Sequence, residues 1–281
     1  MRRTFFSALA SALLAGSGFS SGAVARTAFD AQPGIQRPAN MSLDPYTSQK
    51  VAGILEQRPG FDHLSIGQVI ERISGWFLGT PYQAGMLHGA ENTPERLVID
   101  FRGLDCFTYL DYVEALRVSA SPAQFMQSVI QTRYVDGDVS FPKRKHFFSD
   151  WAYGETHNLA DDITAHISPD ALSVEKHLNE KANGESYLPG LPVVKRTIPY
   201  IPSELIDATV VSRLQTGDLI GIYTRLPGLD VTHTGFFIMT DEGPVLRHAS
   251  SSKANEQVVD SPFLDYVANV PGIVIFRIKA S

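Results

Sequence analysis

The chain has 281 residues, of which 43% are hydrophobic, so it can bury one sizeable core but is too short for three domains. Its formal net charge is −6, and the sequence contains neither a long run of Lys and Arg nor a block of acidic residues. This pattern disfavours nucleic acid as a partner and favours substrates that are neutral or of mixed charge.

The first 25 residues have the pattern of a signal peptide. Arg2 and Arg3 give a positive start, residues 5–14 are apolar but too few to span a bilayer, and Ala23-Val24-Ala25 is a small-x-small cleavage site. A membrane anchor is the alternative interpretation of this segment. Residues 26–50, rich in Pro, Ser, Asn and Gln, predict a linker or loosely packed arm. We therefore expect an exported protein, periplasmic or secreted, whose folded domain occupies residues 51–281.

Helical spacing dominates the first part of this domain. Ser65 is a candidate N-cap for a helix over residues 66–77, which Gly79 ends. The apolar run 97–99 predicts a short buried strand. A second helix is expected from Asp105, and a third from Ser121-Pro122, because Ser is a preferred N-cap and Pro is favoured at the first helical position.

The last third of the sequence predicts strands. Short β-type runs with turn residues between them cover residues 218–223, 234–239, 244–247 and 273–278. Helices thus come first and strands follow. That order indicates an α+β domain with N-terminal helices packed on an antiparallel sheet, rather than alternating βαβ units.

Cys106 is the only cysteine of the chain. Exported proteins usually pair their cysteines as disulfides, which a single cysteine cannot do within its own chain. Cys106 is therefore either a buried, inert residue or a nucleophile. Cys106 lies where the loop 103–105 turns into a predicted helix, with Asp105 as the expected cap. The first turn of a helix offers unpaired N–H groups and partial positive charge, which lower the pKa of a thiol and can receive an oxyanion. This placement favours the nucleophile.

Two of the eight histidines are candidate partners for this thiol. His233 begins one predicted strand and His248 ends another, 15 positions later. If residues 241–243 form a hairpin turn, the two strands are antiparallel and the two imidazoles become neighbours. One can then accept the thiol proton while the other orients it. His146 lies in an aromatic and basic cluster, residues 143–151, and is either a packed surface residue or part of a substrate-facing wall. The others are expected at the surface: His63, His88, His157, His166 and His177.

The ordered motifs resemble those of bacterial cell-wall papain-like enzymes, the NlpC superfamily. The motifs are Gly79-Thr80-Pro81-Tyr82, Asp105-Cys106-Phe107-Thr108, His233-Thr234-Gly235-Phe236 and His248-Ala249-Ser250. Within that superfamily the sequence is similar to the N-acetylmuramoyl-L-alanine amidase-like subgroup. The features that carry this likeness are the run from Asp105 to Glu114, the cluster 144–151, and residues 245–250 followed by Asp260 and Phe263. Thr234 departs from the pattern, which more often has a small aliphatic residue there.

The resemblance implies a papain-like fold and a catalytic triad of Cys106 as nucleophile, His233 as base and His248 as the orienting residue. It also implies an oxyanion site with the Cys106 N–H and Tyr82, next to Asp105, and substrate contacts from Arg144 and Trp151. The expected reaction is hydrolysis of the amide between N-acetylmuramic acid and L-Ala in peptidoglycan or muropeptides, with no cofactor or metal and without stable membrane insertion after signal cleavage.

Three alternatives stay open at this point. The first is an endopeptidase that cuts between D-Glu and diaminopimelate in the stem peptide. The second is a zinc amidase with Cys106, His233 and His248 as ligands, although no His-Glu-x-x-His pattern is present. The third is a non-catalytic wall-binding protein of the same fold.

Overall fold

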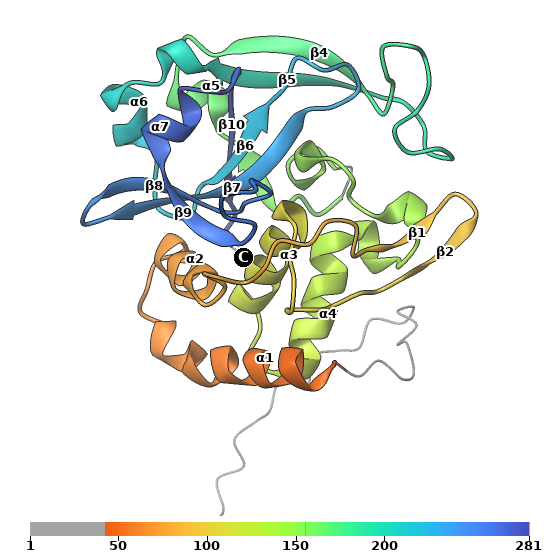
Figure 1. Cartoon of the computed structure of the whole chain (residues 1–281), viewed down its shortest axis with the longest axis vertical. Helices are drawn as coiled ribbons and strands as arrows, with labels where there is room; N and C mark the ends of the chain where they lie inside the picture. The colour runs from red at the N-terminus through yellow and green to blue at the C-terminus, as the bar shows by residue number, and fades with distance from the viewer. Residues whose placement is uncertain (1–42, 155, 281) are drawn as a thin grey trace, which may run out of the picture. The chain divides into compact units, whose positions relative to one another are not determined.

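The computed structural model describes residues 43–154 and 156–280, within the unit Arg37–Ser281 (Figure 1). The expected signal peptide, and the expected arm up to residue 42, lie outside these residues. Over the described residues, no helix has the length and apolar character needed to cross a membrane.

Four helices precede the main sheet and lie together on one side of it (Figure 1). They are α1 (Pro45–Gln57), α2 (Ile66–Gly75), α3 (Cys106–Arg117) and α4 (Pro122–Arg133). Three of their starts follow the expected capping chemistry. Ser65 forms a capping box with Gln68, Asp105 accepts from two N–H groups of the first turn of α3, and Ser121 accepts from Gln124 N.

The main sheet has eight strands, and its neighbouring strands pair antiparallel. The strand order is β4-β5-β10-β6-β7-β8-β9, and β3 pairs with β10. The strands are β3 (Ala160–Asp162), β4 (Leu172–Leu178), β5 (Val194–Pro202), β6 (Leu219–Tyr223), β7 (Val231–Thr240), β8 (Gly243–Ala249), β9 (Val258–Pro262) and β10 (Gly272–Ile278). A separate hairpin joins β1 (His88–Ala90) to β2 (Thr93–Arg96). The expected α+β class with an antiparallel sheet is confirmed.

Side chains alternate between two cores, one on each face of the sheet. In β6, Leu219 and Tyr223 pack in the core shared with α1–α4, whereas Ile220 and Ile222 pack in the second core. Three short helices close that second core: α5 (Thr164–Ile167), α6 (Ala208–Arg213) and α7 (Phe263–Val267). Helices therefore cover both faces of the sheet.

Two expectations about local structure are wrong. Residues 97–99 form no strand. The Val98 carbonyl instead accepts from Arg133 Nη1 at 2.7 Å and from the Tyr112 hydroxyl at 3.3 Å, so side chains rather than a neighbouring strand satisfy it. Residues 45–50, expected within the arm, belong to α1. This helix starts with Asp44 as N-cap and Pro45 in the first turn, and buries its apolar residues against the core.

Substitutions at two helical glycines can test how closely the first helices pack. A Cβ on Gly67 in α2 would collide with the backbone carbonyl of Thr216, which cannot rotate away, whereas a Cβ on Gly53 in α1 would find its nearest atom 4.0 Å away. We expect Gly67→Ala to lower the free energy of unfolding by about 1–3 kcal/mol. Gly53→Ala is the matched control and should raise it by up to about 1 kcal/mol. Urea denaturation measures both, and equal effects would contradict the close α2 contact.

Candidate active site

Cys106 occupies the first position of α3, the helix at the centre of the first core. Asp105 Oδ1 accepts from the N–H groups of Phe107 and Thr108 at 3.1 and 2.7 Å, which fixes the start of the helix one residue before the thiol. Thr234 of β7 donates its hydroxyl to the Cys106 carbonyl oxygen at 3.1 Å. As a residue Cys106 is partly exposed, and the Thr234 contact to its carbonyl places the start of α3 against β7.

The two histidines singled out from the sequence are hydrogen-bonded to each other. His233 Nε2 and His248 Nδ1 are 2.7 Å apart, and the two rings are nearly perpendicular. The β7–β8 hairpin produces this contact, as expected, with Thr240 paired to Gly243 at its turn. Gly235 makes room for it. A Cβ there would come within 2.9 Å of the His248 Cβ and 2.8 Å of the Arg247 carbonyl.

β9 extends this pair by one more group. His248 Nε2 lies 3.0 Å from Ser261 Oγ. The register of β8 on β9 is held by a two-point ion pair, in which Arg247 donates from Nε and Nη2 to the two carboxylate oxygens of Asp260 at 2.7 and 2.8 Å. Arg247 Nη1 also donates to the Glu71 carbonyl of α2. The row His233, His248, Ser261 is therefore anchored to the helical layer.

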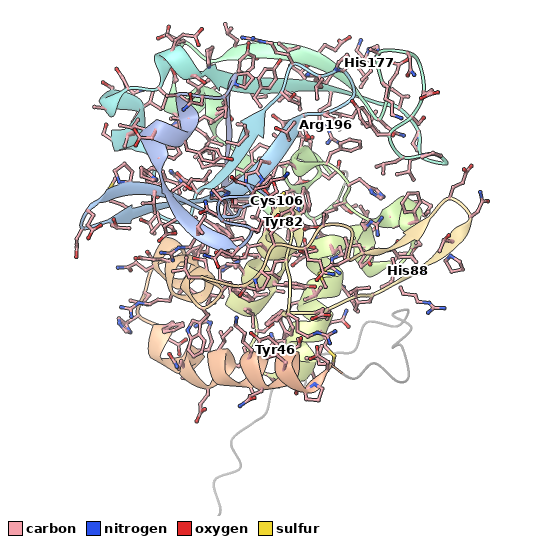
Figure 2. The ribbon with its side chains drawn as sticks, viewed as in Figure 1. Tyr46, Tyr82, His88, Cys106, His177 and Arg196 are labelled. Atoms are coloured by element: carbon pink, nitrogen blue, oxygen red, sulfur yellow. The ribbon has the colours of Figure 1, made fainter. Side chains whose placement is uncertain are left out.

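Two tyrosines adjoin the thiol. Tyr82 lies next to Cys106 in Figure 2, and the bonds Gln83 N to Leu104 O and Leu104 N to Pro81 O tie its segment to the loop that precedes α3. Tyr266 of α7 places its ring 5.0 Å from the His248 ring and 6.4 Å from the His233 ring. Burial raises the pKa of both phenols, and the charge of a Cys106 thiolate raises it further. Tyr266 is thus a common neighbour of the thiol and the histidines.

The structure links Cys106 to the histidines through neighbours. Thr234, adjacent to His233, holds the Cys106 carbonyl, and Tyr266 borders both groups. In the part of the chain that the structure describes, no hydrogen bond joins the thiol to an imidazole. Such bonds are often long before substrate binds and tighten in the complex.

Burial sets the protonation state of the site and reverses one expectation. It raises the pKa of the Cys106 thiol to about 11, with a further rise from the Asp105 carboxylate. The stabilisation expected from the helix start is therefore outweighed. Burial also lowers the pKa of His233 to about 3, helped by the charge of His248, and that of His248 to about 4, against the pull of Asp260. At neutral pH these shifts favour a protonated thiol at Cys106 and neutral imidazoles at His233 and His248.

A metal-binding arrangement finds no support in this geometry. Across the two described stretches, no three His, Cys, Asp or Glu side chains converge in a way that suits a metal ion. One nitrogen of each ring, His233 Nε2 and His248 Nδ1, is engaged in the hydrogen bond between the two imidazoles.

The structure shows the packing and pairing of two residues predicted to contact substrate. Trp151 is 0% exposed and packs edge-on against Phe107 in the first core, so its indole is a core side chain and not a platform for sugars. Arg144 is nearly buried and donates to Glu95 at 2.9 Å. Its charge is therefore already paired. His146 bonds the Phe141 carbonyl at 2.8 Å, which makes it part of the same loop framework.

The sequence missed Ser261 and Tyr266. β9 was not expected as a strand because its short run ends in Asp-Ser-Pro, which is typical of a loop. Tyr266 lies on a helix of five residues, too short to show a period. The remaining histidines are exposed as expected, and Figure 2 shows His88 and His177 far from Cys106.

The comparison with family models identifies one family. The profile of the AmiA-like family, described as N-acetylmuramoyl-L-alanine amidase-like, matches residues 72–273. The solved structure of an N-acetylmuramoyl-L-alanine amidase from Bacteroides uniformis is 27% identical, with 76% of this chain and 99% of that chain covered and a TM-score of 0.65. A Legionella pneumophila protein of family DUF1460 shares the fold at 24% identity, with 83% and 95% covered and a TM-score of 0.69. No curated protein matches.

The fold and the family together define the class of the protein, an amidase-like hydrolase. The chain belongs to the AmiA-like, N-acetylmuramoyl-L-alanine amidase-like family, whose matching region includes Tyr82, Cys106, His233, His248 and Ser261.

The buried histidines should make stability depend on pH. The pKa of each is lower in the folded state than its ordinary value near 6.5, so the unfolded state binds more protons between about pH 6.5 and 4. Stability should therefore fall on acidification through this window, by up to about 1.4 kcal/mol per pH unit for each histidine. Urea unfolding at several pH values should show a shallower dependence for His248→Gln, while His177→Gln, at an exposed site, should match the parent. A steeper dependence for His248→Gln would contradict this assignment.

The Asp105 carboxylate should hold the thiol in its protonated form. Asp105→Asn keeps an oxygen to cap α3 but removes the charge that raises the pKa of Cys106. Alkylation of this single cysteine by iodoacetamide near pH 8 should then be roughly twofold to tenfold faster, because each pKa unit changes the thiolate fraction tenfold. Asp44→Asn, at the cap of α1, should leave the rate unchanged. A slower reaction of Asp105→Asn would refute the electrostatic role.

Proposed function

We propose that this protein is a cysteine-dependent peptidoglycan hydrolase of papain-like fold that cleaves the amide between N-acetylmuramic acid and L-Ala. The observation that carries the proposal is the row of hydrogen bonds from His233 through His248 to Ser261, beside the only cysteine of the chain at the tip of α3. The family supplies the substrate class, and the N-terminal signal pattern supports export to where the wall is.

In the first half of the reaction, His233 Nδ1 accepts the proton of Cys106 as the sulfur attacks the carbonyl carbon of the lactyl amide. A neutral imidazole is the form that can act as this base, and the lowered pKa of His233 keeps it neutral. Because the thiol pKa is raised, the thiolate forms during attack rather than beforehand. The step requires the sulfur and His233 Nδ1 to come within hydrogen-bond distance in the substrate complex.

The tetrahedral intermediate places negative charge on the former carbonyl oxygen. The backbone N–H of Cys106, at the first position of α3, and the Tyr82 hydroxyl are the donors available to it. The protonated His233 then gives its proton to the nitrogen of L-Ala, the C–N bond breaks, and a thioester remains on Cys106. His233 next takes a proton from water, whose oxygen attacks the thioester and releases the acid and the thiol.

Two other functions remain as outcomes of the same test. An endopeptidase cutting between D-Glu and diaminopimelate would use the same residues on a different amide. A non-catalytic wall-binding protein would keep the fold without turnover. The presence of Cys106 together with His233 and His248 favours an enzyme over the binding protein.

The decisive experiment is mass spectrometry of defined muropeptides after incubation with the purified protein. We expect sugar fragments free of peptide together with intact stem peptides, and a loss of at least about a thousandfold in Cys106→Ala, because the nucleophile is removed. His177→Gln, far from the site, should behave as the parent. Shortened stems still attached to sugar would identify the endopeptidase, and turnover that survives in Cys106→Ala would sink the cysteine mechanism.

A further inference from the structure

We propose that Ser261 is a positioning residue that keeps the proton of His248 on Nε2, so that His233 can act as a base. The inference rests on the proposed function, since it concerns the same proton transfer. Its starting point is geometric. Three groups from three adjacent strands form one row, with 2.7 Å between His233 Nε2 and His248 Nδ1 and 3.0 Å between His248 Nε2 and Ser261 Oγ.

The row can carry its protons in only two ways while both imidazoles are neutral. For His233 Nδ1 to accept the thiol proton it must be bare, so the single proton of His233 sits on Nε2 and is donated to His248 Nδ1. His248 Nδ1 must then be bare as well, and its own proton sits on Nε2, where Ser261 Oγ accepts it. In this arrangement every ring nitrogen inside the row has a partner.

The opposite arrangement is inactive. If the Ser261 hydroxyl donates to His248 Nε2, the His248 proton moves to Nδ1 and is donated to His233 Nε2. The proton of His233 then occupies Nδ1, the atom that should receive the thiol proton. The row is therefore a two-state switch, and the direction of one hydroxyl determines whether the base is available.

Ser261 is suited to the accepting role. It is half-buried at the end of β9, so its own hydrogen can point to solvent while its oxygen faces His248, which is 2% exposed. A buried N–H without an acceptor costs free energy, and buried N–H groups are almost always paired. Without the serine oxygen, the Nε2–H form of His248 loses its hydrogen-bond acceptor, and the population of the inactive arrangement rises.

The charges around the pair favour the same arrangement. Asp260 on β9 raises the pKa of His248, which shows that its carboxylate stabilises positive charge on that ring. Tyr266 on α7 also lies against both rings, and Tyr266 in turn borders Cys106 at the start of α3, whose thiol is next to the Asp105 carboxylate. Once His233 holds two protons, the charge spreads along the row only if Ser261 accepts from His248.

The first test reads the protons directly. Long-range ¹H–¹⁵N NMR of protein labelled at histidine distinguishes Nδ1–H from Nε2–H imidazoles. We expect the Nε2–H form for both His233 and His248 in the parent and in Ser261→Thr, which keeps the hydroxyl. Ser261→Ala should populate the Nδ1–H form of His248. An Nδ1–H form of His248 in the parent would overturn the proposal, as would unchanged tautomers in Ser261→Ala.

The second test is kinetic and uses the same variants on muropeptides. Ser261→Ala should lower kcat about tenfold with KM nearly unchanged, since one hydrogen bond to a charged pair is lost. The acidic limb of its pH profile should move to lower pH, because the imidazolium loses an acceptor. Ser261→Thr should recover most of the rate, and Ser212→Ala, an exposed serine of α6, should match the parent.

The two proposals fail separately. If Cys106→Ala is inactive but Ser261→Ala turns over like the parent, only the role of Ser261 is wrong. If Cys106→Ala retains activity, the cysteine mechanism itself is wrong. A fall in activity of Ser261→Ala that Ser261→Thr does not recover, with unchanged tautomers, would show a packing role and would also overturn the inference.

Discussion

The register of β7 on β8 is the constraint on which the site depends. His233 and His248 meet only because the hairpin turn at Thr240 and Gly243 sets a register that brings them together diagonally across the two strands. A slip of one residue would turn every side chain of one strand to the opposite face. Two features prevent such a slip. The backbone of β8 comes so close to Gly235 that a side chain there would not fit. The Arg247–Asp260 ion pair links β8 to β9, and a further hydrogen bond from Arg247 links β8 to α2.

α3 serves the fold and the chemistry at once. Its body is buried on nearly all sides, with Asp111 paired to Arg133 and Glu114 to Arg117, so the helix has a fixed axis and a fixed rotation. Buried ion pairs contribute little net stability, but they tolerate few alternative packings. The first residue of the helix, Cys106, lies against β7, where the Thr234 hydroxyl donates to its carbonyl oxygen.

How far the sequence predicts this structure depends on how local the signals are. The caps at Ser65, Asp105 and Ser121, and the β7–β8 hairpin, follow from short-range chemistry and were predicted. The strand predicted at residues 97–99 does not form, because side chains distant in the sequence hydrogen-bond to the backbone of this segment. Trp151 was misassigned because aromatic residues serve cores and binding sites alike, and only burial separates them. Ser261 and Tyr266 lacked any periodic signal and needed the tertiary structure.

The protonation state links the fold to the reaction. The same burial that fixes the imidazoles raises the pKa of the thiol and lowers that of both histidines, so no resting ion pair forms. A site of this kind is unreactive toward solvent until a substrate brings an electrophilic carbon to the sulfur. Only then does proton transfer to His233 create charge. The negative charge on the carbonyl oxygen is stabilised at the helix tip, and the positive charge on the imidazole is shared along the hydrogen-bonded row. For a lone cysteine expected in an oxidising compartment, keeping the thiol protonated also limits its oxidation, because the thiolate is the reactive species.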